Sequence, residues 1–330
     1  MTAALSTVGS LFIELTPTVP GETLVTARHY TLVAGGAAAN VVFALARLGV
    51  SVRFITAVGN DEFGQLATAE LASFGVDTSG VRHVVGQLTP VTFCAVDLHG
   101  GKCFRFYRSP GQATPMQALT ADDFSGVGES QLFDFSEGSI RAPELRPLIF
   151  QAATCARAHG AQVLYAVNLR LASWGIGEEE IIAIQRAAIG LADIVVLNDE
   201  EVRFITGESG EVGLHILQVL GPRVVVMTRG GDGEMLARVG DVTLHVPPYL
   251  VPVVYDVGAG DTFHAGLVAA ALHRDPVTMD AEAWRAAIQF GAATAAIRVS
   301  TSADPHDLPG YDDVTAWMSL HASGDKCESD

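Results

Sequence analysis

The sequence predicts an α/β protein whose parallel sheet carries helices on both faces. Short apolar runs rich in β-branched residues alternate along the chain with longer amphipathic runs of helical period. Hydrophobic residues make up 49% of the 330 positions, which is enough to bury a large core, and a chain of this length is typical of about one to three domains.

The alternation is clearest in four strand-like stretches, SVRFITAV, AQVLYAV, DIVVLN and PRVVVMTRG, over residues 51–58, 161–167, 193–198 and 222–230. The helical pattern DEFGQLATAELASFG follows the first, EEEIIAIQRAAIGLA follows the second, and a short helix is expected from Glu200. Apolar runs of this kind indicate strands that are buried on both faces. We therefore expect them in one parallel sheet.

Two segments, residues 16–34 and 90–109, interrupt this pattern. The second, PVTFCAVDLHGGKCFRFYRS, predicts two alternating strands joined at residues 99–101. We expect both segments to form a small β lid over the strand ends, where open α/β sheets bind ligands, with Gly35-Gly36 as its hinge. The α/β core would then comprise residues 1–15, 35–89 and 110–330.

Charge and composition narrow the class of partner. A formal net charge of −17 and an isoelectric point near 4.9 oppose binding to nucleic acid or to an anionic membrane surface. The start of the chain has no basic region followed by a cleavage site, and no apolar run reaches the roughly 18 residues of a membrane helix. The four cysteines lack metal-ligand spacing. We expect a cytoplasmic protein with a small-molecule substrate.

The stretch DVGAGDTFHAGLVAAAL, residues 256–272, places glycines and an acid at the start of a helical run. A helix N-terminus exposes unpaired N–H groups, and glycines there let a phosphate approach the backbone. The stretch is not a Walker loop, because neither lysine stands in a Gly-Lys-Ser/Thr context, and Phe263 breaks the dinucleotide fingerprint. An ordinary glycine-rich turn stays open as an alternative. Asp261 suits a base that accepts a proton from an attacking hydroxyl.

Together with further motifs, this stretch resembles the PfkB, or ribokinase-like, family of carbohydrate kinases. The motifs stand in the family's order over almost the whole chain: GGAAANVVFALARLG (35–49), GNDEFG (59–64), NDEE (198–201), TRGGDG (228–233) and DVGAGDTFHAG (256–266). The resemblance implies a ribokinase-like three-layer α/β/α sandwich with a small β-sheet lid. It also implies ATP and Mg²⁺ as cofactors.

The resemblance assigns roles on the phosphate side of the site. Gly258, Ala259 and Gly260 would form an anion hole for the transferring phosphoryl group, and Asp261 would be the general base. Asn198 and Glu201 would act on Mg²⁺ and the ATP phosphates through water. The residues implied to line the nucleotide site are Thr228, Gly230 and Gly233.

On the sugar side, the family positions that hold substrate hydroxyls correspond to Gly35, Gly36 and Asn40, while Glu14 stands where most members carry Asp. FRFYRSPG (104–111) and VNLRLASW (167–174) resemble segments of fructokinases and 2-keto-3-deoxygluconate kinases. They make Arg108 and Arg170 candidates for sugar or phosphate contacts, since an arginine fork makes paired hydrogen bonds. In the second segment Ala166-Val167 replaces the usual Asp-Pro, which leaves the sugar open.

The predicted function is therefore an ATP-dependent sugar kinase, with a fructose-like ketohexose as the first-ranked acceptor. The alternatives are a 2-keto-3-deoxygluconate kinase, then a ribokinase or nucleoside kinase, and, in another class, a sugar-binding regulator without turnover. His264 is interpreted as a packed helix residue, and Val257 in place of the usual Thr argues against potassium activation. A homodimer through the lid strands is a further expectation, because exposed edges pair readily.

Overall fold

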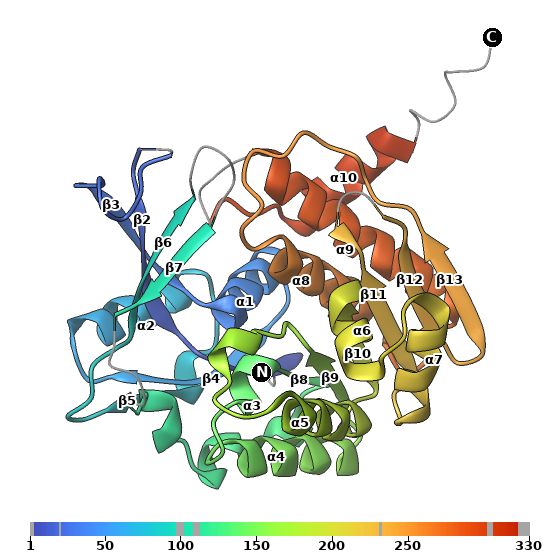
Figure 1. The fold of residues 1–330 in the computed structure, drawn as a ribbon, viewed down its shortest axis with the longest axis horizontal. Coiled ribbons are helices and arrows are strands. Elements are labelled where there is room, and N and C mark those ends of the chain that lie inside the picture. Colours follow the sequence, from blue (N-terminus) through green and yellow to red (C-terminus); the bar gives the residue numbers. More distant parts are fainter. Residues whose placement is uncertain are drawn as a thin grey trace.

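The computed structural model describes residues 3–19, 21–96, 102–107, 113–230, 233–301 and 306–322. These residues form a large sheet flanked by helices and a smaller sheet that projects beside it (Figure 1). The α/β prediction is confirmed.

The large sheet has nine strands in the order β13-β12-β11-β10-β9-β8-β1-β4-β5. All neighbours from β11 to β5 pair in parallel, while the pairs β11–β12 and β12–β13 are antiparallel, so β12 runs against the other strands. The strands are β1 (Leu5–Val8), β4 (Val52–Gly59), β5 (Val81–Val84), β8 (Leu132–Ser136), β9 (Gln162–Ala166), β10 (Ile194–Asn198), β11 (Val224–Thr228), β12 (Met235–Val239) and β13 (Val242–Val246). The four strands expected in one sheet are β4, β9, β10 and β11.

Each face of this sheet packs on a separate hydrophobic core. In β10, Ile194 and Val196 enter one core while Val195 and Leu197 enter the other, because successive side chains point to opposite faces. One core includes side chains of α1 (Ala37–Arg47), α2 (Glu62–Ser73), α8 (Ala259–Leu272), α9 (Ala281–Thr301) and α10 (Tyr311–Ala322). The other includes side chains of α3 (Glu137–Ile140), α4 (Arg146–Ala158), α5 (Glu178–Leu191), α6 (Asp199–Thr206) and α7 (Gly210–Val219). Burial on both sides explains why the strand sequences are continuously apolar.

The smaller sheet has four strands in the order β3-β2-β6-β7. They are β2 (Phe12–Pro17), β3 (Tyr30–Gly35), β6 (Val91–Val96) and β7 (Lys102–Phe106). β6 and β7 pair antiparallel, as the hairpin pattern of residues 90–109 predicts. β2 pairs antiparallel with β3 and parallel with β6, so the sheet joins two segments that lie far apart in the sequence (Figure 1).

Small residues let α8 and α9 pack closely. A Cβ atom at Gly266 would lie 2.9 Å from the Gly291 Cα and 2.5 Å from the Thr294 hydroxyl, so only glycine fits at this crossing. This contact anchors α8 and with it the first turn that carries Asp261. Among the described residues, no helix has the length and apolar character needed to cross a membrane.

Candidate active site

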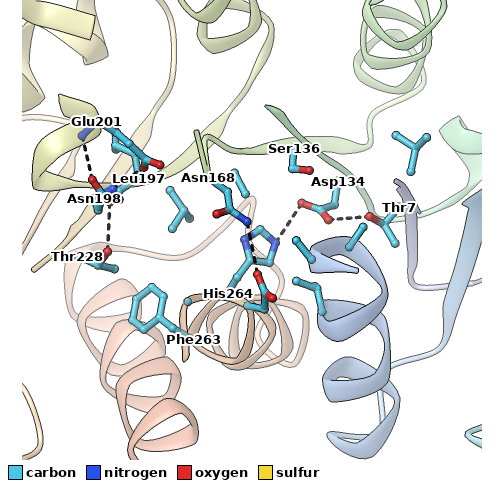
Figure 2. Close-up of a pocket in the computed structure, with 18 residues that line it drawn as sticks. Thr7, Asp134, Ser136, Asn168, Leu197, Asn198, Glu201, Thr228, Phe263 and His264 are labelled. Carbon is cyan, nitrogen blue, oxygen red and sulfur yellow. Dashed lines mark hydrogen bonds and ion pairs between the residues drawn. The ribbon is translucent and has the colours of Figure 1, made fainter. Parts of the chain in front are cut away.

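A cavity of about 110 Å³ lies where the parallel strands end (Figure 2). β1, β8, β10 and β11 supply lining residues from their carboxyl ends, and α1 and α8 close the cavity with their first turns. In parallel α/β sheets this edge is the usual place for ligands. The polar residues that line it are Thr7, Asp134, Ser136, Asn168, Asn198, Glu201, Thr228, Asp261 and His264.

Asp261 is held at both carboxylate oxygens by amide side chains from other parts of the chain. Asn40 Nδ2 on α1 donates to Oδ2 at 3.0 Å, and Asn168 Nδ2, which follows β9, makes a longer contact of 3.5 Å with Oδ1. The two contacts fix the plane of the carboxylate within the first turn of α8. A base held in this way needs little reorganisation to accept a proton.

Burial raises the pKa of Asp261 from 3.8 to about 6, against smaller opposing effects of the Asn40 hydrogen bond and of Arg170 and His264. Removal from water disfavours the charged carboxylate, whereas donors and positive charges favour it. A carboxyl group with a pKa near the working pH is suited to general base catalysis.

The turn before Asp261 leaves backbone N–H groups of α8 without helical partners. Gly258 is the N-cap with φ 84°, in the left-handed region, and its carbonyl accepts from the Thr262 N–H at 2.8 Å. The Ala259 N–H bonds to the Asp256 carbonyl at 3.3 Å, whereas the next N–H groups of the first turn have no preceding helical carbonyls to bond, and Gly260 lines the cavity. Ala259 lies between these glycines and does not line the cavity. The turn therefore has the chemistry of an anion site.

Asn198 and Glu201 stand at the start of α6 and hold each other. Asn198 Oδ1 accepts from the Glu201 N–H at 2.9 Å, and Glu201 Oε2 accepts from the Asn198 N–H at 2.8 Å. Glu201 Oε1 also accepts from the Leu169 N–H at 2.6 Å, which ties α6 to the segment that carries Asn168. Burial raises the pKa of Glu201. Both side chains face the cavity, with Thr228 beside them (Figure 2).

The remaining candidates on the nucleotide side do not line this cavity. Gly230 and Gly233 flank two residues that lie outside the described part of the chain. Arg170, a candidate for sugar or phosphate contacts, is exposed. Its charge favours the ionised forms of Asp261 and Glu201, so it lies near the carboxyl ends of the strands where the cavity is found. Arg108 lies outside the described residues.

A second, smaller cavity of about 20 Å³ brings together Glu14, Gly35, Asn40 and Gly258. Burial raises the pKa of Glu14, and the charge of Asp261 raises it further. Gly36, with φ 118°, is the N-cap of α1, where a Cβ atom would lie 2.7 Å from the Ser10 carbonyl oxygen. The sugar-side residues of β2, β3 and α1 thus meet the glycine turn of α8 at one place.

Five polar residues that line the cavity were not predicted as functional: Thr7, Asp134, Ser136, Asn168 and His264. Asn168 lies within the segment VNLRLASW, but its left-handed φ of 39° and its contact with Asp261 have no sequence signal. Asp134 had one, because a charged residue inside the apolar strand LFDFS needs a partner when buried.

Comparison with known proteins identifies the architecture. The family model described as pfkB family carbohydrate kinase matches residues 2–309. The chain therefore belongs to the pfkB family of carbohydrate kinases. As a member, this kinase is a phosphotransferase whose acceptor is an alcohol group. The family prediction made from the motifs is confirmed.

Among curated relatives, this kinase is 32% identical over 317 residues to fructokinase-1 of Oryza sativa subsp. japonica, covering 94% of this chain and 96% of the relative. It is 31% identical to fructokinase-1 of Zea mays, covering 91% and 93% of the two chains. Among solved structures, fructokinase from Xylella fastidiosa with bound ATP superposes with a TM-score of 0.85 at 24% identity, covering 97% and 99% of the two chains.

A second solved structure is that of fructokinase from Vibrio cholerae O395 with fructose, ADP and calcium bound. It has a TM-score of 0.82 at 26% identity and covers 96% of this kinase and 99% of that chain. The predicted ribokinase-like fold is thereby confirmed.

Proposed function

We propose that this kinase transfers the γ-phosphoryl group of ATP to a hydroxyl group of a fructose-like ketohexose, with Asp261 as the general base. The observation that carries the proposal is the position of Asp261. Its carboxylate contacts the side-chain amides of Asn40 and Asn168. It lies next to the glycine turn at Gly258, in the cavity at the carboxyl ends of the strands. A proton acceptor and an anion site side by side are the two elements that phosphoryl transfer to a hydroxyl requires.

In this scheme the acceptor hydroxyl lies between the two cavities, against Asp261. Asn40 lines the smaller cavity and contacts Asp261, so it connects the sugar side with the base. As the oxygen of the hydroxyl attacks the γ-phosphorus, its O–H bond breaks and the proton passes to Asp261. The bond between the γ-phosphorus and the oxygen that bridges to the β-phosphate breaks at the same time, so that ADP leaves with that oxygen. The N–H groups at Gly258 to Gly260 stabilise the negative oxygens of the transferring group.

The residues of the cavity fit ATP with Mg²⁺. Among the described residues, no three or more His, Cys, Asp or Glu side chains form a cluster that could hold a metal. Mg²⁺ does not require such a cluster, because it keeps several water ligands and binds mainly through the phosphates of its nucleotide. Glu201 offers its carboxylate there, and each oxygen that accepts a backbone N–H retains a lone pair for a water. When bound, Mg²⁺ neutralises charge on the phosphate oxygens. Asn198 and Thr228 would contact the phosphate and nucleotide side, with Gly230 and Gly233 bordering the nucleotide.

The choice of a fructose-like acceptor rests on the relatives. Fructokinases from rice and maize match more than 90% of this chain, and a neighbour of known structure holds fructose and ADP. Glu14, Gly35, Gly36 and Asn40 would hold sugar hydroxyls on the lid side, while Arg108 and Arg170 would contact the sugar or its phosphate.

We also propose that the four-stranded sheet acts as the lid over the core. Its strands β2 and β3 extend beyond the expected lid segment 16–34, to Phe12 and Gly35. Its strands supply Glu14 and Gly35 to the smaller cavity. Fructose should therefore slow hydrogen exchange in β2 and β3, and unchanged exchange at saturating fructose would contradict a lid.

The same sheet offers a surface for a homodimer. β3 and β7 are its edge strands, and β7 exposes Phe104 and Phe106. If β7 pairs with β7 of a second copy, light scattering should give the mass of a dimer. Phe104→Asp should reduce that mass to the mass of a monomer, because it places a charge at the paired edge.

The proposed function is tested by ADP release from ATP·Mg²⁺ with fructose, 2-keto-3-deoxygluconate, ribose, tagatose and adenosine as acceptors. We expect fructose to give the highest kcat/KM. A higher value for 2-keto-3-deoxygluconate or ribose would keep the kinase and replace the substrate. Sugar binding with no turnover of any acceptor would favour the alternative of a regulator.

A further inference from the structure

A buried chain of polar side chains lies beneath the base. Thr7 Oγ1 on β1 donates to Asp134 Oδ2 on β8 at 2.7 Å, and Asp134 Oδ1 lies 3.0 Å from His264 Nε2 on α8. The side chains of His264 and Asp134 are only 5% and 8% exposed. Figure 2 shows Thr7, Asp134 and His264 in a row, joined by these two contacts.

His264 shares its helix face with the base. It follows Asp261 by three residues on α8, which places the two side chains on neighbouring positions of one face, and both line the same cavity. Both ring nitrogens are buried and make no hydrogen bond among the described residues, although Nε2 lies at ion-pair distance from Asp134 Oδ1. A buried nitrogen beside a polar cavity is normally met by water or by a ligand.

A role in packing alone does not account for this arrangement. A carboxylate is costly to bury unless it is paired, and Asp134 stands in a strand whose neighbours are Phe133 and Phe135. An apolar residue at each of positions 134 and 264 would fill the space without that cost. What the pair adds is an imidazole ring held close to Asp261, where its charge favours the ionised base.

We propose that His264, held in place by Asp134 and Thr7, is a positioning residue for phosphoryl transfer, and that its ring favours the ionised carboxylate of Asp261 within the buried cavity. The proposal rests on the proposed role of Asp261 as the base. His264 acts through Asp261 and does not itself accept the proton of the sugar hydroxyl.

The other charged groups around the base are few and come from different elements. β8 presents Asp134, the segment after β9 presents Arg170, and β2 presents Glu14. On the side facing α9, Arg298 lines the smaller cavity, and α6 contributes Glu201 to the larger one. From α1 the group that faces Asp261 is the neutral Asn40. Among the described residues, His264 and Arg170 are the groups whose positive charge acts on Asp261 directly.

The test compares pH profiles of kcat/KM for the sugar at saturating ATP·Mg²⁺ in the wild type and in His264→Gln. Glutamine keeps a nitrogen near the position of Nε2 and hence the contact with Asp134, but it never carries a charge. The acid limb is the part of the profile where kcat/KM falls as Asp261 becomes protonated. In the variant we expect this limb to lie at a pH higher by about half a unit to one unit, so that kcat/KM on the acid side is about 3-fold to 10-fold lower than in the wild type. Above pH 8 the variant should stay within about 3-fold of the wild type, since Asp261 is then ionised in both.

Two further variants separate the possible failures. His245→Gln removes a histidine that pairs with Glu234 on the exposed face of β13, and it should leave the acid limb in place. Asp261→Asn, run in parallel, tests the base itself: normal turnover in this variant would overturn the proposed function and not merely the role of His264. If His264→Gln does not fold, His264→Asn supplies the same loss of charge.

An acid limb that does not move in a folded His264 variant would overturn the inference. So would a loss of kcat/KM of equal size at every pH, because that pattern belongs to a packing defect. Ionisation of ATP is common to all variants and cancels in the comparison.

Discussion

Asp261→Asn should make the protein more stable while removing its activity. The pKa of Asp261 is about 6 in the folded chain against 3.8 for the free side chain, a difference of about 2 units. At about 1.4 kcal/mol per unit, the ionised carboxylate costs the folded state about 3 kcal/mol at pH 8. Asparagine carries no such cost, and the pKa difference already includes the favourable interaction of the ionised acid with the helix N-terminus. The expected net gain is about 3 kcal/mol.

The sign of the pH dependence follows from the raised pKa. The folded protein binds this proton more tightly than the unfolded chain, so the wild type regains stability as the pH falls from above 6 toward 3.8. About half of the penalty should be gone at pH 5, and the advantage of the variant should shrink accordingly. Urea unfolding of both proteins at pH 8 and pH 5 measures this. A variant less stable than the wild type at pH 8, or a difference that does not change with pH, would refute the reasoning.

Two more substitutions probe the same site. Gly258→Ala meets no atom within 4 Å but forces φ 84° on a residue with a Cβ, so we expect a loss of about 1 to 2 kcal/mol in unfolding free energy and at least about a 10-fold loss of kcat. Stability and kcat close to those of the wild type would show that the turn tolerates a side chain. Asn168→Asp places a second carboxylate against Asp261 Oδ1, and like charge should raise the acid limb of kcat/KM by about one unit. A pH profile identical to that of the wild type would mean that the long contact to Asn168 does not reach the base.

The sequence predicts most of the large sheet because two-sided burial makes its strands apolar, as in DIVVLN and PRVVVMTRG. It also points to Asp261 and Asn40, which stand in separate motifs 221 positions apart and meet in the structure. The order of the motifs identifies the family, and the family's shared fold implies that these two residues lie close together. Helix and strand patterns within short stretches of sequence do not predict a contact between residues so far apart.

Other parts of the site depend on three-dimensional contacts that leave little trace in the sequence. The left-handed backbone of Asn168 is set by its surroundings, since non-glycine residues seldom adopt it unaided. His264 fits an alanine-rich helix as a packed residue, and only the fold shows that Asp134 faces it from β8. The motif assigns Glu201 to Mg²⁺ and phosphate. The structure adds that one carboxylate oxygen accepts from the Asn198 N–H at the start of α6 and the other from the N–H of Leu169, which follows Asn168, so that Glu201 joins α6 to this segment.

The central claim is that Asp261 is the base that activates the sugar hydroxyl. Its most direct test is transfer of labelled γ-phosphate from ATP to fructose by the wild type and by Asp261→Asn, with ATP·Mg²⁺ affinity measured by calorimetry on the same samples. We predict transfer by the wild type, a loss of at least about 100-fold in the variant, and ATP affinities within about 3-fold of each other. Transfer by Asp261→Asn at a rate near that of the wild type would contradict the claim.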